Sequence, residues 1–284
     1  MPPMTRIQGF EILERIGAGA ESVIYRARQL SPRRIVALKH VVIDTPENQK
    51  YLRHVRNEYN VLRSLQESAN GTPPPQGIVR VYDLIRTGFL RRHKEHLLVM
   101  QYIEGRDLKH EGRYPTGQMV NILIGVCDAL AALHQRGLIH GDLKPENIVV
   151  DAAGKPTIVD FGFSCKVGTR AESIKGTREY MAPEQADRGQ LTEKTDIYNF
   201  GATMYFLFSG RHVPAIIPVP GDASHFIGSR DLAVPSLHTF NESLPPALDD
   251  IVLQCVQKNE LDRPSRIEEV REVLTEVDKR YSDG

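Results

Sequence analysis

The chain has 284 residues, of which 40% are hydrophobic and 25% charged, with 36 basic and 36 acidic side chains. This is the composition of a folded globular protein, which excludes the disordered and fibrous classes, and the length predicts one large domain or two lobes. The three cysteines, Cys127, Cys165 and Cys255, form no CxxC pair. A disulfide framework and a zinc site are therefore not expected, and a reducing, cytoplasmic setting is favoured.

The zero net charge hides an uneven distribution. Residues 1–98 hold 16 of the 36 Lys and Arg residues but only 9 of the 36 Asp and Glu residues. The basic runs at 26–34 and 91–94 are either a surface for an acidic partner or solvated loops, of which solvated loops are the commoner case. Because no aromatic residues are interleaved with these charges, nucleic-acid binding is not expected.

No targeting or membrane segment is expected in this chain. The N-terminal residues lack the apolar core of a signal peptide. The two most apolar windows, Ile122–Leu133 and Phe200–Phe208, are shorter than a membrane span, and Asp128 interrupts the first. Both windows are predicted to be buried helices.

The first hundred residues predict a small antiparallel sheet with one helix. Apolar alternation from Phe10 to Val42 indicates three strands, with turns at 17–19 and 31–32. A helix start is expected at 45–47, and helical spacing then continues to Leu65. After a loop at 66–77, two further strands are expected at Ile78–Thr87 and His96–Tyr102.

Beyond Asp107 the periodicity becomes helical. One apolar face from Met119 to Leu133 predicts a long helix that ends at Gly137. Two closing helices are expected at Leu248–Val256 and Ile267–Val277. The stretch 211–246 is a long link rich in Pro and Gly, which suggests a surface for recognition and docking.

The densest chemistry lies in the sequence HGDLKPEN at 140–147. Asp142 could accept a hydroxyl proton, Lys144 could neutralise a phosphoryl group and Asn147 could bind a metal ion, which are the tasks of a phosphoryl-transfer loop. A solvated turn closed by Pro145 is the alternative for this stretch taken alone.

Three further motifs agree with that chemistry. Gly17 and Gly19 lie at a strand-to-strand turn, where backbone N–H groups can approach phosphates, although a plain hairpin would look the same. A buried Lys39 would need an anion and a core-facing Glu58 would need a cation, so each can satisfy the other. Asp160 ends an apolar strand and is either a turn residue or a magnesium ligand.

In order and spacing, these motifs resemble those of the eukaryotic-type protein kinase superfamily, and HGDLKPEN with GTREYMAPEQ resembles its prokaryotic serine/threonine members. The resemblance spans Gly17 to Arg263. It implies an α+β, bilobal, single kinase domain over 1–284. A small antiparallel-sheet lobe with one main helix would occupy about residues 1–100, a hinge 101–107, and a larger, mainly helical lobe 108–284.

The resemblance also implies residue roles. Lys39 would pair with the ATP phosphates and with Glu58. Asp142 would orient the substrate hydroxyl and accept its proton, while Lys144 would steady the transferred phosphoryl group. His140 would be a packing residue rather than a base. The implied partners are proteins with Ser or Thr hydroxyls.

The implied cofactors are ATP and Mg²⁺, with Mn²⁺ as an alternative. Asn147 and Asp160 would hold the metal ion, and Met100 would be the gatekeeper beside the adenine. The implied ATP-binding residues are Ile16, Gly17, Ala18, Gly19, Ile24, Ala37, Lys39, Gln101, Ile103, Asp107 and Val149.

Two departures from the family pattern stand out. Ser22 occupies the place of the third glycine, which predicts weakened nucleotide binding. Gly141 replaces the arginine that in many relatives receives a phosphorylated activation segment. Ser164, Thr169, Ser173 and Thr177 are therefore expected to be available for phosphorylation but not required for activity, and Thr177 is expected to be a docking residue.

Two alternative functions stay open. The His-Gly-Asp sequence also resembles the loop of small-molecule kinases such as aminoglycoside phosphotransferases. A pseudokinase scaffold that binds partners through the 211–246 stretch is the non-enzymatic alternative.

Overall fold

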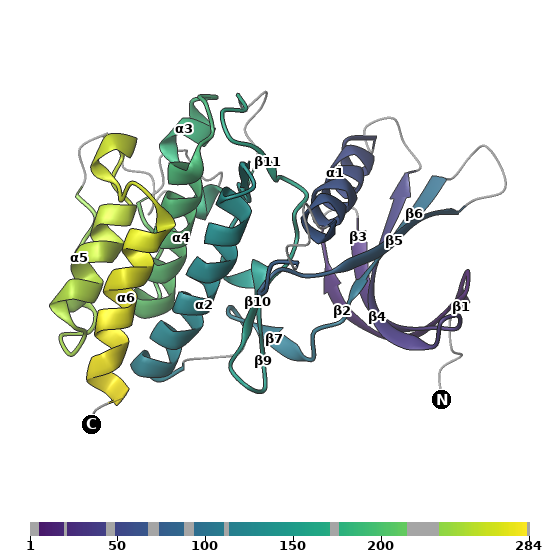
Figure 1. Ribbon diagram of the computed structural model, residues 1–284, viewed down its shortest axis with the longest axis horizontal. Coiled ribbons are helices and arrows are strands. Elements are labelled where there is room, and N and C mark those ends of the chain that lie inside the picture. Colours follow the sequence, from purple (N-terminus) through teal and green to yellow (C-terminus); the bar gives the residue numbers. More distant parts are fainter. Residues whose placement is uncertain are drawn as a thin grey trace. The chain divides into compact units, whose positions relative to one another are not determined.

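The computed structural model describes residues 6–19, 22–43, 49–67, 74–87, 94–110, 114–170, 176–214 and 233–282. The fold is α+β, as predicted (Figure 1). The chain divides into two compact units. The first comprises Met1–Pro74, Val79–Glu104 and Asp160–Gly162, and the second comprises Pro75–Ile78, Gly105–Val159 and Phe163–Gly284.

The first unit is built on a six-stranded antiparallel sheet in the order β1-β2-β3-β4-β6-β5. Its strands are β1 (Arg6–Ile7), β2 (Phe10–Ala18), β3 (Ser22–Gln29), β4 (Arg34–Ile43), β5 (Val81–Thr87) and β6 (Lys94–Gln101). The predicted strands between Phe10 and Val42 are confirmed. The next one begins at Val81 rather than at Ile78, because Ile78 forms a bridge to Ile158 in the second unit.

The two faces of this sheet carry different chemistry. One face is an apolar core made by Phe10, Ala27, Val36, Leu38, Leu97 and Val99. Because successive side chains of a strand point to opposite faces, Ala37 and Lys39 lie on the other face. Alternation along β4 thus places the lysine of the Val-Ala-Leu-Lys motif away from the apolar core.

Helix α1 (Gln49–Gln66) confirms the predicted helix of the first unit. It buries Val55, Leu62 and Leu65 and packs against β4, β5 and β6. The expected helix start at 45–47 lies outside the described residues. At the other end, Gln66 donates to the carbonyl oxygen of Val81 at 2.9 Å and accepts from its N–H at 2.5 Å.

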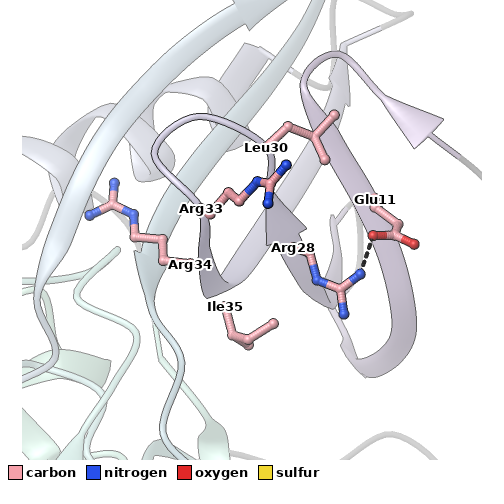
Figure 2. Close-up of a pocket in the computed structure, with 6 residues that line it drawn as sticks. All are labelled: Glu11, Arg28, Leu30, Arg33, Arg34 and Ile35. Carbon is pink, nitrogen blue, oxygen red and sulfur yellow. Dashed lines mark hydrogen bonds and ion pairs between the residues drawn. The ribbon is translucent and has the colours of Figure 1, made fainter.

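Two of the four arginines in the basic run at 26–34 are ion-paired within the sheet, and a third packs on an aromatic ring. Arg28 pairs with Glu11 of β2 at 2.5 Å, and the two side chains line a shallow hollow of about 550 Å³ (Figure 2). Arg26 pairs with Glu14 at 2.9 Å. The guanidinium of Arg34 lies 3.6 Å from the ring centroid of Tyr82. These contacts favour the structural explanation of the run; the other basic run, except Lys94, lies outside the described residues.

The second unit is mainly helical. Its helices are α2 (Thr116–His134), α3 (Pro183–Ala186), α4 (Glu193–Ser209), α5 (Pro246–Cys255) and α6 (Ile267–Ser282). Helix α2 packs against α6 and α4 packs against α5. The predicted long helix and the two predicted closing helices are confirmed. Gly137 has the positive φ of +66° that favours glycine after a helix.

Helix α2 is longer than the apolar window Ile122–Leu133 that was identified from the sequence. Its 19 residues make it long and apolar enough, by length and composition, to cross a membrane. Within the second unit, however, 56% of its most apolar window is buried, including Ile122, Leu130 and Leu133. The predicted burial of this helix is therefore confirmed, although the prediction that it is too short was wrong.

Short strands bracket the 140–147 sequence. Strand β8 (Leu138–Ile139) pairs with β11 (Cys165–Lys166). Strands β7 (Gly105–Asp107), β9 (Ile148–Asp151) and β10 (Pro156–Ile158) form a sheet in the order β10-β9-β7. The loop between β8 and β9 thus begins and ends on hydrogen-bonded strands, which fixes the positions of its functional side chains.

Candidate active site

The loop 140–147 is anchored to α4 by Asp196, a fully buried carboxylate. Asp196 accepts hydrogen bonds from the backbone N–H groups of His140 and Gly141, each at 2.8 Å, and its Oδ2 lies 2.9 Å from Nε2 of His134. Burial raises the pKa of Asp196, but these partners outweigh it and lower the pKa below its usual value. The charged carboxylate therefore fixes the backbone just before Asp142.

Asp142, Lys144 and Thr177 come together in the second unit. The Thr177 N–H donates to Oδ1 of Asp142 at 2.7 Å, and the Lys144 ammonium donates to Oγ1 of Thr177 at 2.6 Å. Nζ of Lys144 lies 3.3 Å from Oδ2 of Asp142. A carboxylate and a cation thus lie together beside the Thr177 loop, and these are the two charged groups that phosphoryl transfer to a substrate hydroxyl uses.

Asn147 is buried and its amide orientation is fixed. Its Nδ2 donates to the carbonyl oxygen of Asp142 at 2.8 Å. Its Oδ1 accepts no hydrogen bond within the part of the chain that the structure describes. An amide oxygen held in one direction suits a hard cation such as Mg²⁺, so this residue fits the predicted metal-binding role.

Lys39 joins two carboxylates in the first unit. Its Nζ lies 2.7 Å from Oε2 of Glu58 and 3.1 Å from Oδ1 of Asp160. Burial lowers the pKa of Lys39, but the charges of Asp160 and Glu58 more than compensate, so the net shift is upward and the ammonium stays charged. The predicted pairing of Lys39 with Glu58 is present.

Asp160 has an unusual backbone conformation for a non-glycine residue, with φ +64°. It lies two residues after the end of β10 and belongs to the compact unit that contains Lys39. Its side chain is 40% exposed, whereas that of Glu58 is 1% exposed. The carboxylate of Asp160 is thus the accessible member of the triad and could bind a cation.

The predicted nucleotide residues of the first unit lie on β2, β3, β4 and the end of β6. Gly17 is paired with Ile24 across the hairpin, and the Gly19 N–H donates to the carbonyl oxygen of Ser22 at 2.8 Å. Ala37 is paired with the buried Met100. The remaining residues on these strands or just after them are Ile16, Ala18, Gln101 and Ile103.

Gln101 shows one constraint that the sequence does not reveal. Its N–H already donates to the carbonyl oxygen of Arg80 at 2.8 Å. The N–H of Gln101, one of its two backbone groups that a nucleotide base could bind, is therefore already engaged.

In the second unit, Asp107 and Val149 are neighbours in the register of β7 and β9. The carboxylate of Asp107 accepts hydrogen bonds from the N–H groups of Lys109 and His110, both at 3.0 Å. It therefore caps the turn after β7, a role that was not predicted from the sequence and that is additional to the predicted ATP-binding role of Asp107.

Glu184 and Arg263 form a buried bidentate ion pair. The two guanidinium nitrogens NH1 and NH2 lie 2.8 and 2.9 Å from Oε1 and Oε2 of Glu184. This ties the short helix α3 to the segment that precedes α6. The segment carrying Thr177 is thereby connected to the helical core.

The candidate phosphorylation sites differ in accessibility. Ser164 is 2% exposed and donates to the carbonyl oxygen of His140 at 3.2 Å, so it is an internal structural residue. Thr169 is exposed and donates to the carbonyl oxygen of Lys166 at 2.6 Å. Ser173 lies outside the described residues.

A family model for the protein kinase domain matches residues 10–276. The chain belongs to the protein kinase family. This membership confirms the predicted family and fold class, and it assigns the carboxylate, cation and hydroxyl of the second unit to a kinase domain.

Relatives of this kinase domain come from several bacteria. Serine/threonine-protein kinase PrkC of Bacillus subtilis is 30% identical, over 93% of this chain and 40% of the relative. PknB of Mycobacterium leprae is 28% identical, over 94% and 43%, and PknL of Mycobacterium tuberculosis H37Rv is 31% identical, over 88% and 60%. The chain thus spans 40% to 60% of the length of these relatives.

Proposed function

We propose that this domain is an ATP-dependent serine/threonine protein kinase that transfers the γ-phosphoryl group of ATP to Ser or Thr hydroxyls of proteins. The observation that carries the proposal is the contact of Lys144 with both Asp142 and Thr177. Membership of the protein kinase family and the names of the bacterial relatives support it.

The reaction breaks the bond between the γ-phosphorus of ATP and its bridging oxygen, and forms a bond from that phosphorus to the substrate oxygen. Asp142 orients the hydroxyl and accepts its proton, while Lys144 neutralises charge on the transferred group. Lys39, held by Glu58, pairs with the nucleotide phosphates. ADP leaves with the electrons of the broken bond.

Asn147 and Asp160 are the proposed magnesium ligands. Their amide and carboxylate oxygens are the donors that Mg²⁺ prefers, and Mn²⁺ accepts the same donors. The ion, when bound, neutralises charge on the phosphate oxygens. The proposed adenine and ribose contacts are those expected from the sequence, from Ile16 to Val149.

Specific contacts favour a protein kinase over the two alternatives. Lys39, Glu58 and Asp160 are all present and ion-paired, which counts against a pseudokinase scaffold. Thr177 lies in a loop that α3 and its Glu184–Arg263 pair connect to the helical core, and a kinase for small molecules does not need such a loop for protein docking.

We further propose protein substrates, a cytoplasmic location for this domain, and docking through the 211–246 stretch. Residues 215–232 of that stretch lie outside the described part of the chain. The part that follows is fixed by Asp249, which accepts from the Ser236 hydroxyl at 2.6 Å and from the Leu237 N–H at 2.7 Å. A rigid base for the stretch is consistent with a recognition role.

Transfer of radiolabelled phosphate from ATP with Mg²⁺ to the domain itself and to a generic basic protein tests the function. Wild type should label Ser or Thr hydroxyls, whereas Asp142→Asn and Lys39→Ala should lower the rate by about a hundredfold or more. Asp250→Asn and Lys279→Ala make the same chemical changes at exposed sites and should stay active. Wild-type domain that binds ATP without transferring phosphate would instead support the scaffold.

A further inference from the structure

A buried network of two side-chain amides lies directly beside the 140–147 loop. Nε2 of Gln185 donates to the carbonyl oxygen of Gly141 at 2.7 Å. Oε1 of Gln185 accepts from the N–H of Ala182 at 3.0 Å and from Nδ2 of Asn199 at 2.9 Å. The same Nδ2 donates to the carbonyl oxygen of Tyr180 at 2.7 Å. Gln185 and Asn199 are 3% and 1% exposed, so these bonds are shielded from water.

The network holds the backbone carbonyl of Gly141, the residue directly before Asp142. The N–H of Gly141 is bound by Asp196 and its carbonyl oxygen is bound by Gln185. Gly141 has φ +75°, and a Cβ atom there would lie 3.3 Å from the carbonyl oxygen of Phe163. The backbone before Asp142 is thus fixed from α4 and from α3, in a conformation that favours glycine.

The loop that carries Thr177 approaches the same place closely. A Cβ atom on Gly176 would lie 3.3 Å from Oδ1 of Asp142, 3.5 Å from the carbonyl oxygen of Gly141 and 3.6 Å from Nε2 of Gln185. Gln185 therefore connects the loop of Asp142 to helix α3, and through Asn199 it is linked to Tyr180, which follows Thr177 closely in the chain.

We propose that Gln185 is a positioning residue, which holds the backbone directly before Asp142 in place. The proposal rests on the kinase function proposed above. The Gln185 amide links the carbonyl oxygen of Gly141 to the N–H of Ala182 at the start of helix α3, and Asn199 of α4 donates to the same amide.

A purely structural role predicts different chemistry at position 185. As the third residue of α3, Gln185 accepts from the N–H of Ala182, and a glutamate could do the same. The glutamine amide also donates to the carbonyl oxygen of Gly141. Gln185→Glu keeps the acceptor for Ala182 and Asn199 but can donate to that carbonyl only in its protonated form, whereas Gln185→Met loses both interactions.

The test compares Gln185→Met, which is close in shape but forms no amide hydrogen bonds, with Gln185→Glu. Both should lower kcat by about 10- to 100-fold while KM for ATP stays within about twofold, because a small displacement of a catalytic group is costly. Gln254→Met, at an exposed position of α5, is the matched control. A folded Gln185→Met variant with wild-type kcat would overturn the proposal.

Amide hydrogen exchange supplies a readout that does not need activity. Exchange in the segment 139–143 should rise in Gln185→Met and Gln185→Glu but not in Gln254→Met. Unchanged exchange would contradict the proposal even if the domain transferred no phosphate, whereas absent transfer with increased exchange would contradict the proposed function alone. If either variant fails to melt cooperatively, the shorter amide of Gln185→Asn replaces it in both measurements, with the same expected and contradicting results.

Discussion

The Lys39–Glu58 ion pair affects the pKa of the buried Glu58 carboxyl group. Glu58 is 1% exposed, and burial raises its pKa while the Lys39 ammonium lowers it, with a net upward shift. Removing the cation would leave a buried carboxylate without compensation. Such a group takes up a proton rather than remain charged.

Lys39→Met should therefore destabilise the domain by about 3 kcal/mol near neutral pH, and by less in acid. Without Lys39, the pKa of folded Glu58 lies further above its unfolded value, so the folded state binds more protons and gains stability as pH falls. The loss should be smaller by about 1 kcal/mol at about pH 5.5 than at about pH 7.5. Urea unfolding at both pH values measures this. In Lys39→Met, Glu58→Gln the extra pH dependence should disappear, and its persistence would point to another group.

Buried charged residues that require one partner could be predicted from the sequence. Residues that hydrogen-bond to groups distant in the sequence could not. Lys39 and Glu58 could be paired because each was a buried charge in need of a partner. Gln185 was missed because neither its carbonyl acceptor on Gly141 nor its donor on Asn199 is near in sequence. The turn-capping role of Asp107 was missed because its hydrogen bonds depend on the local backbone angles.

Among the elements, α3 and the segment before α6 are joined by one guanidinium. Arg263 is fully buried and uses its donors on Glu184 and on the carbonyl oxygens of Gln257, Lys194 and Lys258. Five N–H groups in a fixed plane meet five acceptor contacts. A lysine has three donors and cannot reproduce this fork.

Arg263→Lys should accordingly lower the free energy of unfolding by about 3 kcal/mol, since at least two buried acceptors lose their donor. Arg266→Lys is the control, because that side chain is 62% exposed in a long i,i+3 pair and should change stability by less than about 0.5 kcal/mol. Equal urea midpoints for Arg263→Lys and wild type would disprove the importance of the planar fork.

Long helices and strands could be predicted from the sequence, whereas very short strands could not. Helix α2 and the strands between Phe10 and Val42 repeat their pattern often enough to identify them. The strands β7, β8 and β11 contain two or three residues, which is too few for a period to appear. The strand pairings that fix the 140–147 loop are long-range contacts, and a local sequence pattern does not specify them.

At the scale of the whole molecule, the proposed function requires the folded domain to bind ATP and a metal ion. Ligand binding is then visible as a gain in stability, whatever the protein substrate turns out to be. A ligand present at about a hundredfold excess over its Kd adds about 2.7 kcal/mol to the free energy of unfolding.

ATP with Mg²⁺ should raise the melting temperature of the domain more than ATP with EDTA, because Asp160 and Asn147 can bind the phosphates only through a cation. Circular dichroism melts with ATP alone, Mg²⁺ alone and both together measure this. Asp160→Asn should lose the magnesium-dependent part of the shift, whereas Asp250→Asn, which is exposed on α5, should keep it. If millimolar ATP with Mg²⁺ leaves the melting temperature of wild type unchanged, the nucleotide site is wrong. If Asp160→Asn keeps the full shift, the site stands but its metal ligand lies elsewhere.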